Sequence, residues 1–126
     1  MRNLVFLFIL LISCAPKYKV FKSFQKDSLK ITILTQSGNL KLGTNEIQVI
    51  VNPKENIIKE IFLYMPPIND KPERRILTKL KNTKEGIYEG SISITERGIW
   101  DLVIVLSDNS LISERIPIGE NDLFGF

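Results

Sequence analysis

Apolar and polar side chains alternate with a period of two through most of this chain, and this alternation constrains the fold more than any other feature. The first clear example starts at Leu29, where Leu29, Ile31 and Ile33 alternate with Lys30 and Thr32. Successive side chains of a β-strand point to opposite faces, so this spacing predicts a strand with one buried face. Apolar spacings of three and four residues do not persist in any window, so the sequence predicts no helix in this part of the chain.

Further strand-like runs follow, with short turn signals between them. The runs cover residues 47–51, 57–65, 76–80, 88–94, 100–106 and 112–118. Residues 57–65 are almost continuously apolar, which predicts a central strand covered on both faces. Pro117 lacks an N–H group, so we expect the last run at a sheet edge. About seven short strands with turn signals between them predict an all-β sandwich over residues 29–118.

The composition excludes several classes of site. The chain of 126 residues contains no histidine and one cysteine, Cys14, and its formal net charge is +3. An intrachain disulfide, a Cys/His zinc cluster and a Ser-His-Asp triad are therefore all impossible. A net charge this small does not indicate a nucleic-acid partner. We expect a single non-catalytic domain without a cofactor. Chemistry by carboxylates alone stays open, although no paired-carboxylate signature supports it.

The first fourteen residues carry a targeting pattern. Arg2 precedes an unbroken apolar run, residues 4–12, which is too short to cross a bilayer as a helix but suits a signal peptide. The run ends in Leu11-Ile12-Ser13-Cys14, which resembles the bacterial lipoprotein signal. That resemblance implies removal of residues 1–13, a diacylglycerol on the Cys14 thiol, and a lipid-anchored protein on the cell envelope that faces the periplasm or the exterior. The alternative is an ordinary secreted protein with a cysteine near its cleavage site.

Residues 14–28 separate this signal from the predicted sandwich and mix basic with aromatic side chains. They include Lys17, Lys19, Lys22 and Lys26 together with Tyr18, Phe21 and Phe24. Such a tether beside a lipid anchor could rest on anionic headgroups. The alternative is a spacer whose second half forms a first edge strand. At the other end, we expect residues 119–126 to be either a frayed tail or a hydrophobic latch on the last sheet.

Four short motifs occur in an order that is typical of one family. They are Gly43-Thr44-Asn45, Met65-Pro66-Pro67, Glu85-Gly86-Ile87-Tyr88 and Gly98-Ile99-Trp100-Asp101-Leu102. In this order and spacing, over roughly residues 29–107, the chain resembles the YtkA-like and FixH-like family of small immunoglobulin-like β-sandwiches. The resemblance implies an immunoglobulin-like fold on a bacterial cell envelope, near copper handling, respiratory oxidase assembly or envelope transport.

Three residues of these motifs have structural explanations. Gly86 can supply the positive φ of a tight turn. We expect Tyr88 to form a tyrosine corner, with a buried ring and a hydroxyl bonded back to its turn. We expect Trp100 to fill the core between the two sheets. These roles predict core residues rather than a functional site.

Met65 is the weak candidate for a metal ligand. Several members of the resembled family carry further methionines or histidines beside the Met-Pro element, which would suit Cu(I). A soft cation needs two or three soft ligands. In this chain no methionine, cysteine or histidine follows Met65. We therefore expect no metal site made by this chain alone. In the alternative, the protein is a copper-handling accessory in which Met65 contributes to a site shared with a partner.

The segment that follows Met65 is the candidate recognition loop. Three prolines restrict it, so a partner would lose less entropy on ordering it. Binding loops often lie at one end of a sandwich. The candidate partner-binding residues are Tyr64, Met65, Ile68, Asp70, Arg74 and Arg75. We therefore expect a membrane-anchored module that binds another envelope protein, either a respiratory or a transport component. The alternative is a merely solvated loop.

Overall fold

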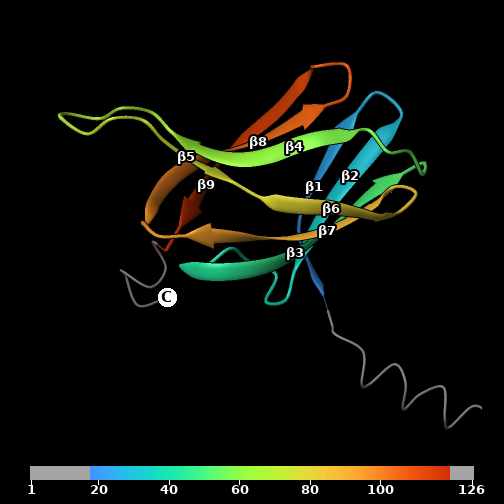
Figure 1. Cartoon of the computed structure of the whole chain (residues 1–126), viewed down its shortest axis with the longest axis horizontal. Coiled ribbons are helices and arrows are strands. Elements are labelled where there is room, and N and C mark those ends of the chain that lie inside the picture. The colour runs from blue at the N-terminus through green and yellow to red at the C-terminus, as the bar shows by residue number, and fades with distance from the viewer. Residues whose placement is uncertain (1–17, 120–126) are drawn as a thin grey trace, which may run out of the picture.

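The computed structural model describes residues 18–119, and this part of the chain consists of β-strands and loops (Figure 1). Its strands are β1 (Lys19–Lys26), β2 (Leu29–Thr35), β3 (Gly43–Asn52), β4 (Ile58–Met65), β5 (Arg74–Leu77), β6 (Lys79–Lys84), β7 (Ile87–Ile94), β8 (Gly98–Leu106) and β9 (Leu111–Ile118). The predicted signal, the lipidation candidate Cys14 and all but the first residue of the predicted tail lie outside the described residues. Among residues 18–119, no helix is long and apolar enough to cross a membrane.

The strands form two antiparallel sheets. The five-stranded sheet has the order β1-β2-β3-β7-β6, and the four-stranded sheet has the order β5-β4-β8-β9. Figure 1 shows β4 and β5 in one layer and β6 and β7 in the other. Apart from β1, this is the arrangement of an immunoglobulin domain, in which strands A, B, E and D face strands C′, C, F and G. The predicted all-β, immunoglobulin-like sandwich is confirmed.

The core lies between the two sheets and is built from the alternating apolar residues. Ile31, Val49, Leu63 and Ile104 are each no more than 1 % exposed, and they come from both sheets. Trp100 is also buried, as predicted, and its indole N–H donates to the Glu96 carbonyl oxygen at 3.1 Å. The period of two in the sequence therefore reflects one buried face on each sheet.

The first strand lies in the segment that the sequence assigns to a tether. β1 pairs with β2, and a bulge between Val20 and Lys22 lets both Phe21 and Phe24 pack on the core. Lys22 also forms a 2.9 Å ion pair with Glu114 on β9. The alternative of an edge strand in the second half of this segment is confirmed. The sheet therefore starts at Lys19, before the predicted first residue of the sandwich at position 29.

The single strand predicted over residues 76–80 consists of two strands in different sheets. β5 ends at Leu77 in the four-stranded sheet, and β6 starts at Lys79 in the five-stranded sheet. Between them, the N–H and hydroxyl groups of Thr78 both donate to the Ile61 carbonyl oxygen, at 3.2 and 2.8 Å. These bonds fix the point at which the chain changes sheets. Together with β1, this crossing explains why the described residues form nine strands rather than about seven.

Tyr88 has the predicted buried ring, but its hydroxyl does not bond back to its own turn. It accepts the backbone N–H of Ile58 on β4 at 3.2 Å. The turn is held by Gly86, which has the predicted positive φ of +75° and donates its N–H to Oδ1 of Asn56 at 2.8 Å. Because Tyr88 lies on a central strand that faces the other sheet, its hydroxyl joins the two sheets instead.

Candidate functional site

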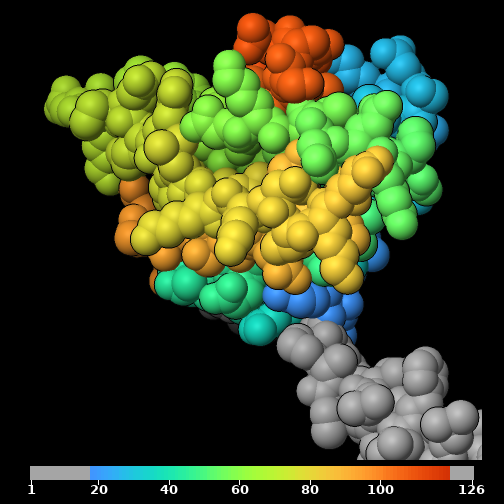
Figure 2. Space-filling view, turned by 45° about the vertical axis from the view of Figure 1, so that its right-hand side comes forward, coloured from blue at the N-terminus to red at the C-terminus, as the bar shows by residue number. Residues whose placement is uncertain are grey.

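The β4–β5 hairpin carries the predicted recognition residues and projects beyond the rest of the sandwich (Figure 1). Two backbone hydrogen bonds between Ile68 and Lys71, at 3.2 and 2.9 Å, close its turn. Asn69 adopts a left-handed φ of +55°, which asparagine tolerates better than most residues. Ile68 and Asp70 are exposed in this turn. Figure 2 shows the hairpin as a protrusion from the body of the sandwich, and the residues at its tip are exposed.

The register of the hairpin sends neighbouring residues to opposite sides of the sheet. Tyr64 lies opposite Arg75, and Met65 lies opposite Arg74. Directly opposed side chains share a face. Because Met65 is buried in the core, Met65 and Arg74 lie on the inner side, and Tyr64 and Arg75 lie on the outer face. The predicted recognition residues therefore divide into an inner pair, an outer pair and the turn, and they do not form one surface.

The inner pair belongs to a closed cluster, which we call the inner cluster: Met65, Lys71, Arg74 and Glu96. Met65 is 4 % exposed, and Nη2 of Arg74 donates to its sulfur. Nε of Arg74 lies 2.8 Å from Oε2 of Glu96, and Nζ of Lys71 lies 3.8 Å from Oε1. The Nε contact is an ion pair by distance but is not aligned as a hydrogen bond, so this buried nitrogen has no hydrogen-bond partner within residues 18–119. The cluster ties the hairpin to the loop between β7 and β8.

This cluster changes the interpretation of two predicted residues. The sequence places Arg74 on an exposed loop, but its side chain is only 24 % exposed because the register points it toward Met65. The Arg74 guanidinium donates a hydrogen bond to the Met65 sulfur, and its positive charge at this position disfavours the binding of a metal cation. Within residues 18–119, no group of three or more His, Cys, Asp or Glu side chains could hold a metal ion. The alternative of a copper-handling accessory gains no support from this geometry.

The outer pair belongs to a second group, the arginine–aromatic surface, formed by Phe62, Tyr64, Arg75 and Leu77. Cζ of Arg75 lies 4.7 Å from the ring centre of Phe62 and 5.9 Å from that of Tyr64, within the range of a cation–π interaction. Leu77 lies opposite Phe62 and is 56 % exposed. The surface therefore presents apolar area, two aromatic rings and a guanidinium side by side.

Glu73 holds Tyr64 in place at the edge of this surface. The Tyr64 hydroxyl donates to Oε2 of Glu73 at 2.9 Å. This hydrogen bond raises the pKa of Tyr64 above its usual value, because a carboxylate acceptor stabilises the protonated phenol. Tyr64 therefore remains a neutral contact residue with an apolar ring and a polar tip at neutral pH.

Sequence reasoning missed Phe62 and Leu77. The prediction that residues 57–65 are covered on both faces is only partly correct, because Ile61 and Leu63 are buried while Phe62 and Tyr64 are half-buried. Strand alternation alone would have placed Phe62 on the same face as Tyr64. The residues opposite them depend on the register of the hairpin, which the sequence does not specify.

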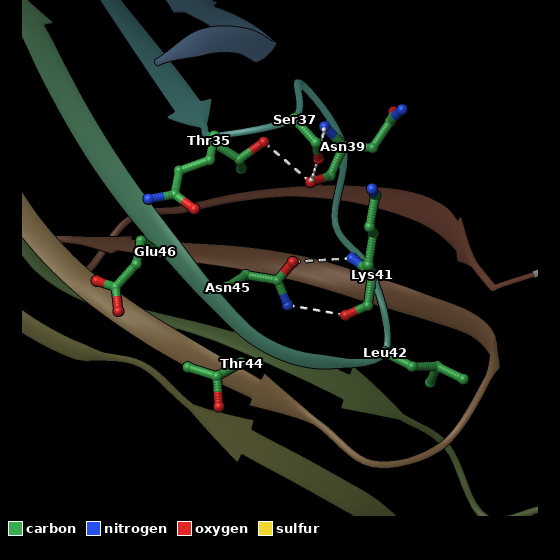
Figure 3. A pocket seen from close by; sticks show the side chains of 9 residues that line it. Thr35, Ser37, Asn39, Lys41, Leu42, Thr44, Asn45 and Glu46 are labelled. Atoms are coloured by element: carbon green, nitrogen blue, oxygen red, sulfur yellow. Dashed lines mark hydrogen bonds between the residues drawn. The ribbon is translucent and has the colours of Figure 1, made fainter. Parts of the chain in front are cut away.

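A polar cavity of about 180 Å³ beside the β2–β3 loop is a second candidate (Figure 3). Its lining residues are Thr35, Gln36, Ser37, Asn39, Lys41, Leu42, Thr44, Asn45 and Glu46. Asn45, from the first family-like motif, donates to the Lys41 carbonyl oxygen at 2.8 Å and accepts the Lys41 N–H at 2.9 Å. Thr35 donates to the Asn39 carbonyl oxygen at 2.9 Å. These groups hold the loop itself, so the cavity is best explained as part of the loop structure.

The comparisons with known proteins identify no relative. No protein-family model, no curated protein and no solved structure matches the chain. The resemblance to the YtkA-like and FixH-like family therefore stays a proposal that depends on the four motifs in the sequence.

Proposed function

We propose that this protein is a lipid-anchored, non-catalytic module of a bacterial cell envelope that binds another envelope protein, a respiratory or transport component. Residues 1–14 support the location through their basic start, short apolar run and final Ser13-Cys14. The YtkA-like and FixH-like motifs support the same location and the accessory role. Attachment through a diacylglycerol would be stable, because two acyl chains bind a bilayer far more strongly than one.

The arginine–aromatic surface is the observation that carries the binding part of this proposal. Tyrosine and arginine are enriched among the residues that dominate protein–protein binding energy. Arg75 lies within cation–π distance of two rings that hold it in place, so binding would cost little entropy for ordering the Arg75 side chain. Leu77 is 56 % exposed, and its burial by a partner would remove apolar area from water. The surface therefore combines an ordered polar anchor with exposed apolar area.

Features of the sequence and of the site support binding rather than catalysis. The chain has no histidine that could act as a general base near neutral pH. The carboxylate of Glu73 accepts the hydrogen bond of Tyr64, and that of Glu96 pairs with Arg74 and Lys71. These carboxylates orient neighbouring side chains, which is a structural use of their charge.

Affinity isolation of the full chain from membranes tests the binding proposal. Leu77→Glu places a charge in the arginine–aromatic surface, and we expect it to remove a co-isolated envelope protein. Val20→Glu is the matched control, because Val20 is 59 % exposed and lies on the outer face of the other sheet. Loss of the same protein from both variants, or from neither, would contradict the proposal.

A separate experiment tests the anchor. We expect Cys14→Ser to abolish lipid attachment and leave an unprocessed precursor, which a shift in gel mobility and loss of metabolic lipid labelling would show. A Cys14→Ser protein that is processed and fractionates with membranes as the wild type does would refute the lipoprotein signal.

A further inference from the structure

Arg75 is held in position while its hydrogen-bond donors stay free. The rings of Phe62 and Tyr64 hold its guanidinium, with Cζ at 4.7 and 5.9 Å from their centres. A cation–π contact attracts the charge of a guanidinium to a ring face and does not pair its N–H groups with an oxygen acceptor. The ion pairs within residues 18–119 do not include Arg75, whereas Arg74 is engaged by Glu96. Arg75 is therefore a preorganised donor without an acceptor in the described part of the chain.

Two acidic groups around this surface already have partners. Glu73 accepts the hydrogen bond of Tyr64 at 2.9 Å. Asp101 lies opposite Tyr64 on the neighbouring strand β8, and its Oδ1 is 3.7 Å from Nε of Arg115. Glu60 lies further along β4 on the same face, and no ion pair joins it to Arg75. The guanidinium of Arg75 is therefore available to an anion from another molecule.

A carboxylate is the anion that a protein partner most commonly presents, through an aspartate or glutamate side chain. Glu73 and Asp101 flank Tyr64, which lies directly opposite Arg75. These charges do not choose between anions, because a phosphate dianion would feel both their repulsion and the attraction of Arg75 about twice as strongly as a carboxylate would. A carboxylate also matches the planar fork of an arginine with two parallel hydrogen bonds. Leu77 adds exposed apolar area next to this position.

We propose that Arg75 anchors a carboxylate of the partner protein, and that a large apolar side chain next to this carboxylate packs on Leu77. The partner segment would thus carry an aspartate or glutamate beside an apolar residue. This inference rests on the proposed binding function and adds the chemistry that the arginine–aromatic surface selects.

Site-specific crosslinking in membranes tests this inference with the full chain. A photoreactive phenylalanine analogue at position 77 keeps an apolar side chain and reports on what contacts the surface. In this background, we expect Arg75→Gln to lower the yield of the crosslinked product by about tenfold or more, as expected for the loss of a charged hydrogen bond. Arg97→Gln is the matched control, since Arg97 is an exposed arginine of the β7–β8 loop and lies outside the arginine–aromatic surface, and we expect no change.

The crosslinked partner segment then identifies the acceptor. We expect it to contain an aspartate or glutamate whose change to the amide lowers the yield as Arg75→Gln does. A charge swap, with Arg75→Glu in this protein and arginine in place of that carboxylate, should restore the product. A yield that Arg75→Gln leaves unchanged, or a segment without a carboxylate, would overturn the inference and leave the proposed binding function intact. The absence of any crosslinked product would overturn both.

Discussion

The two sides of the β4–β5 hairpin use the same residue type for different purposes. On the inner side, Arg74 contacts the sulfur of Met65 and the carboxylate of Glu96. On the outer side, Arg75 lies within cation–π distance of two aromatic rings, and it takes part in none of the ion pairs of the described residues. The inner arginine is engaged by two groups of its own chain, although its Nε has no hydrogen-bond partner there, and we propose that the outer arginine binds another molecule. The two arginines of this hairpin therefore differ in whether their polar atoms contact groups of their own chain, and not in residue type.

Substitution of one leucine on each side gives the largest expected difference in the free energy of unfolding. Leu63 is fully buried on the inner side, and Leu77 is 56 % exposed on the outer face. We expect Leu63→Ala to lower the free energy of unfolding by about 2–5 kcal/mol, because it removes buried apolar contacts and leaves a cavity. Leu77→Ala should stay within about 0.5 kcal/mol of the wild type. Denaturant titration of both variants measures this difference, and equal losses would mean that the two faces are not distinct.

Replacement of Met65 should have a smaller effect on the free energy of unfolding. Met65→Leu keeps the volume and the apolar character but removes the sulfur, so we expect a loss of less than about 1.5 kcal/mol in the free energy of unfolding. Partner capture from membranes should not change, because Met65 lies on the inner side. If Met65→Leu abolished capture while the protein stayed folded, the sulfur would be a functional ligand, and the copper-handling alternative would replace our proposal.

The smallest expected effect is a change in the titration of Tyr64. Glu73 raises the pKa of this phenol, so Glu73→Gln should move the pKa down toward its usual value of 10.0. Because the pKa of Tyr64 is higher in the folded state than in the unfolded state, this hydrogen bond contributes its full stabilisation at pH values below the unfolded-state pKa. The stabilisation is lost as the pH rises through the folded-state pKa. Nuclear magnetic resonance of tyrosine ring carbons measures the shift. An unchanged Tyr64 pKa in Glu73→Gln would show that the two side chains do not interact in solution.

The sandwich could be predicted because its pattern is local. Each strand has one buried face, so the period of two located most strands, and Trp100 and Pro117 were placed correctly in the core and in an edge strand. The crossing at Thr78 could not be predicted, because it depends on hydrogen bonds to Ile61 in another strand. Strand β1 was only one of two alternatives, since aromatic and basic residues also suit a membrane-facing tether.

The candidate site could be predicted only in part. The sequence pointed to the segment after Met65, but it grouped Arg74 with Arg75 on one exposed loop. A strand that starts at Arg74 puts these two neighbours on opposite faces. The turn at residues 68–71 sets which residues lie opposite each other, and this register is a property of the folded hairpin.

The most direct test of the division between the two sides is to compare Arg74→Gln with Arg75→Gln, with both stability and partner capture measured for each full-length variant. We expect Arg74→Gln to lower the free energy of unfolding by about 1–2 kcal/mol, because it breaks a partly buried charged contact, and to keep capture at a temperature where it is folded. We expect Arg75→Gln to stay within about 0.5 kcal/mol of the wild type and to lose capture. The opposite pattern, in which Arg75→Gln destabilises the protein and Arg74→Gln loses capture while folded, would contradict the assignment of structure to the inner side and recognition to the outer face.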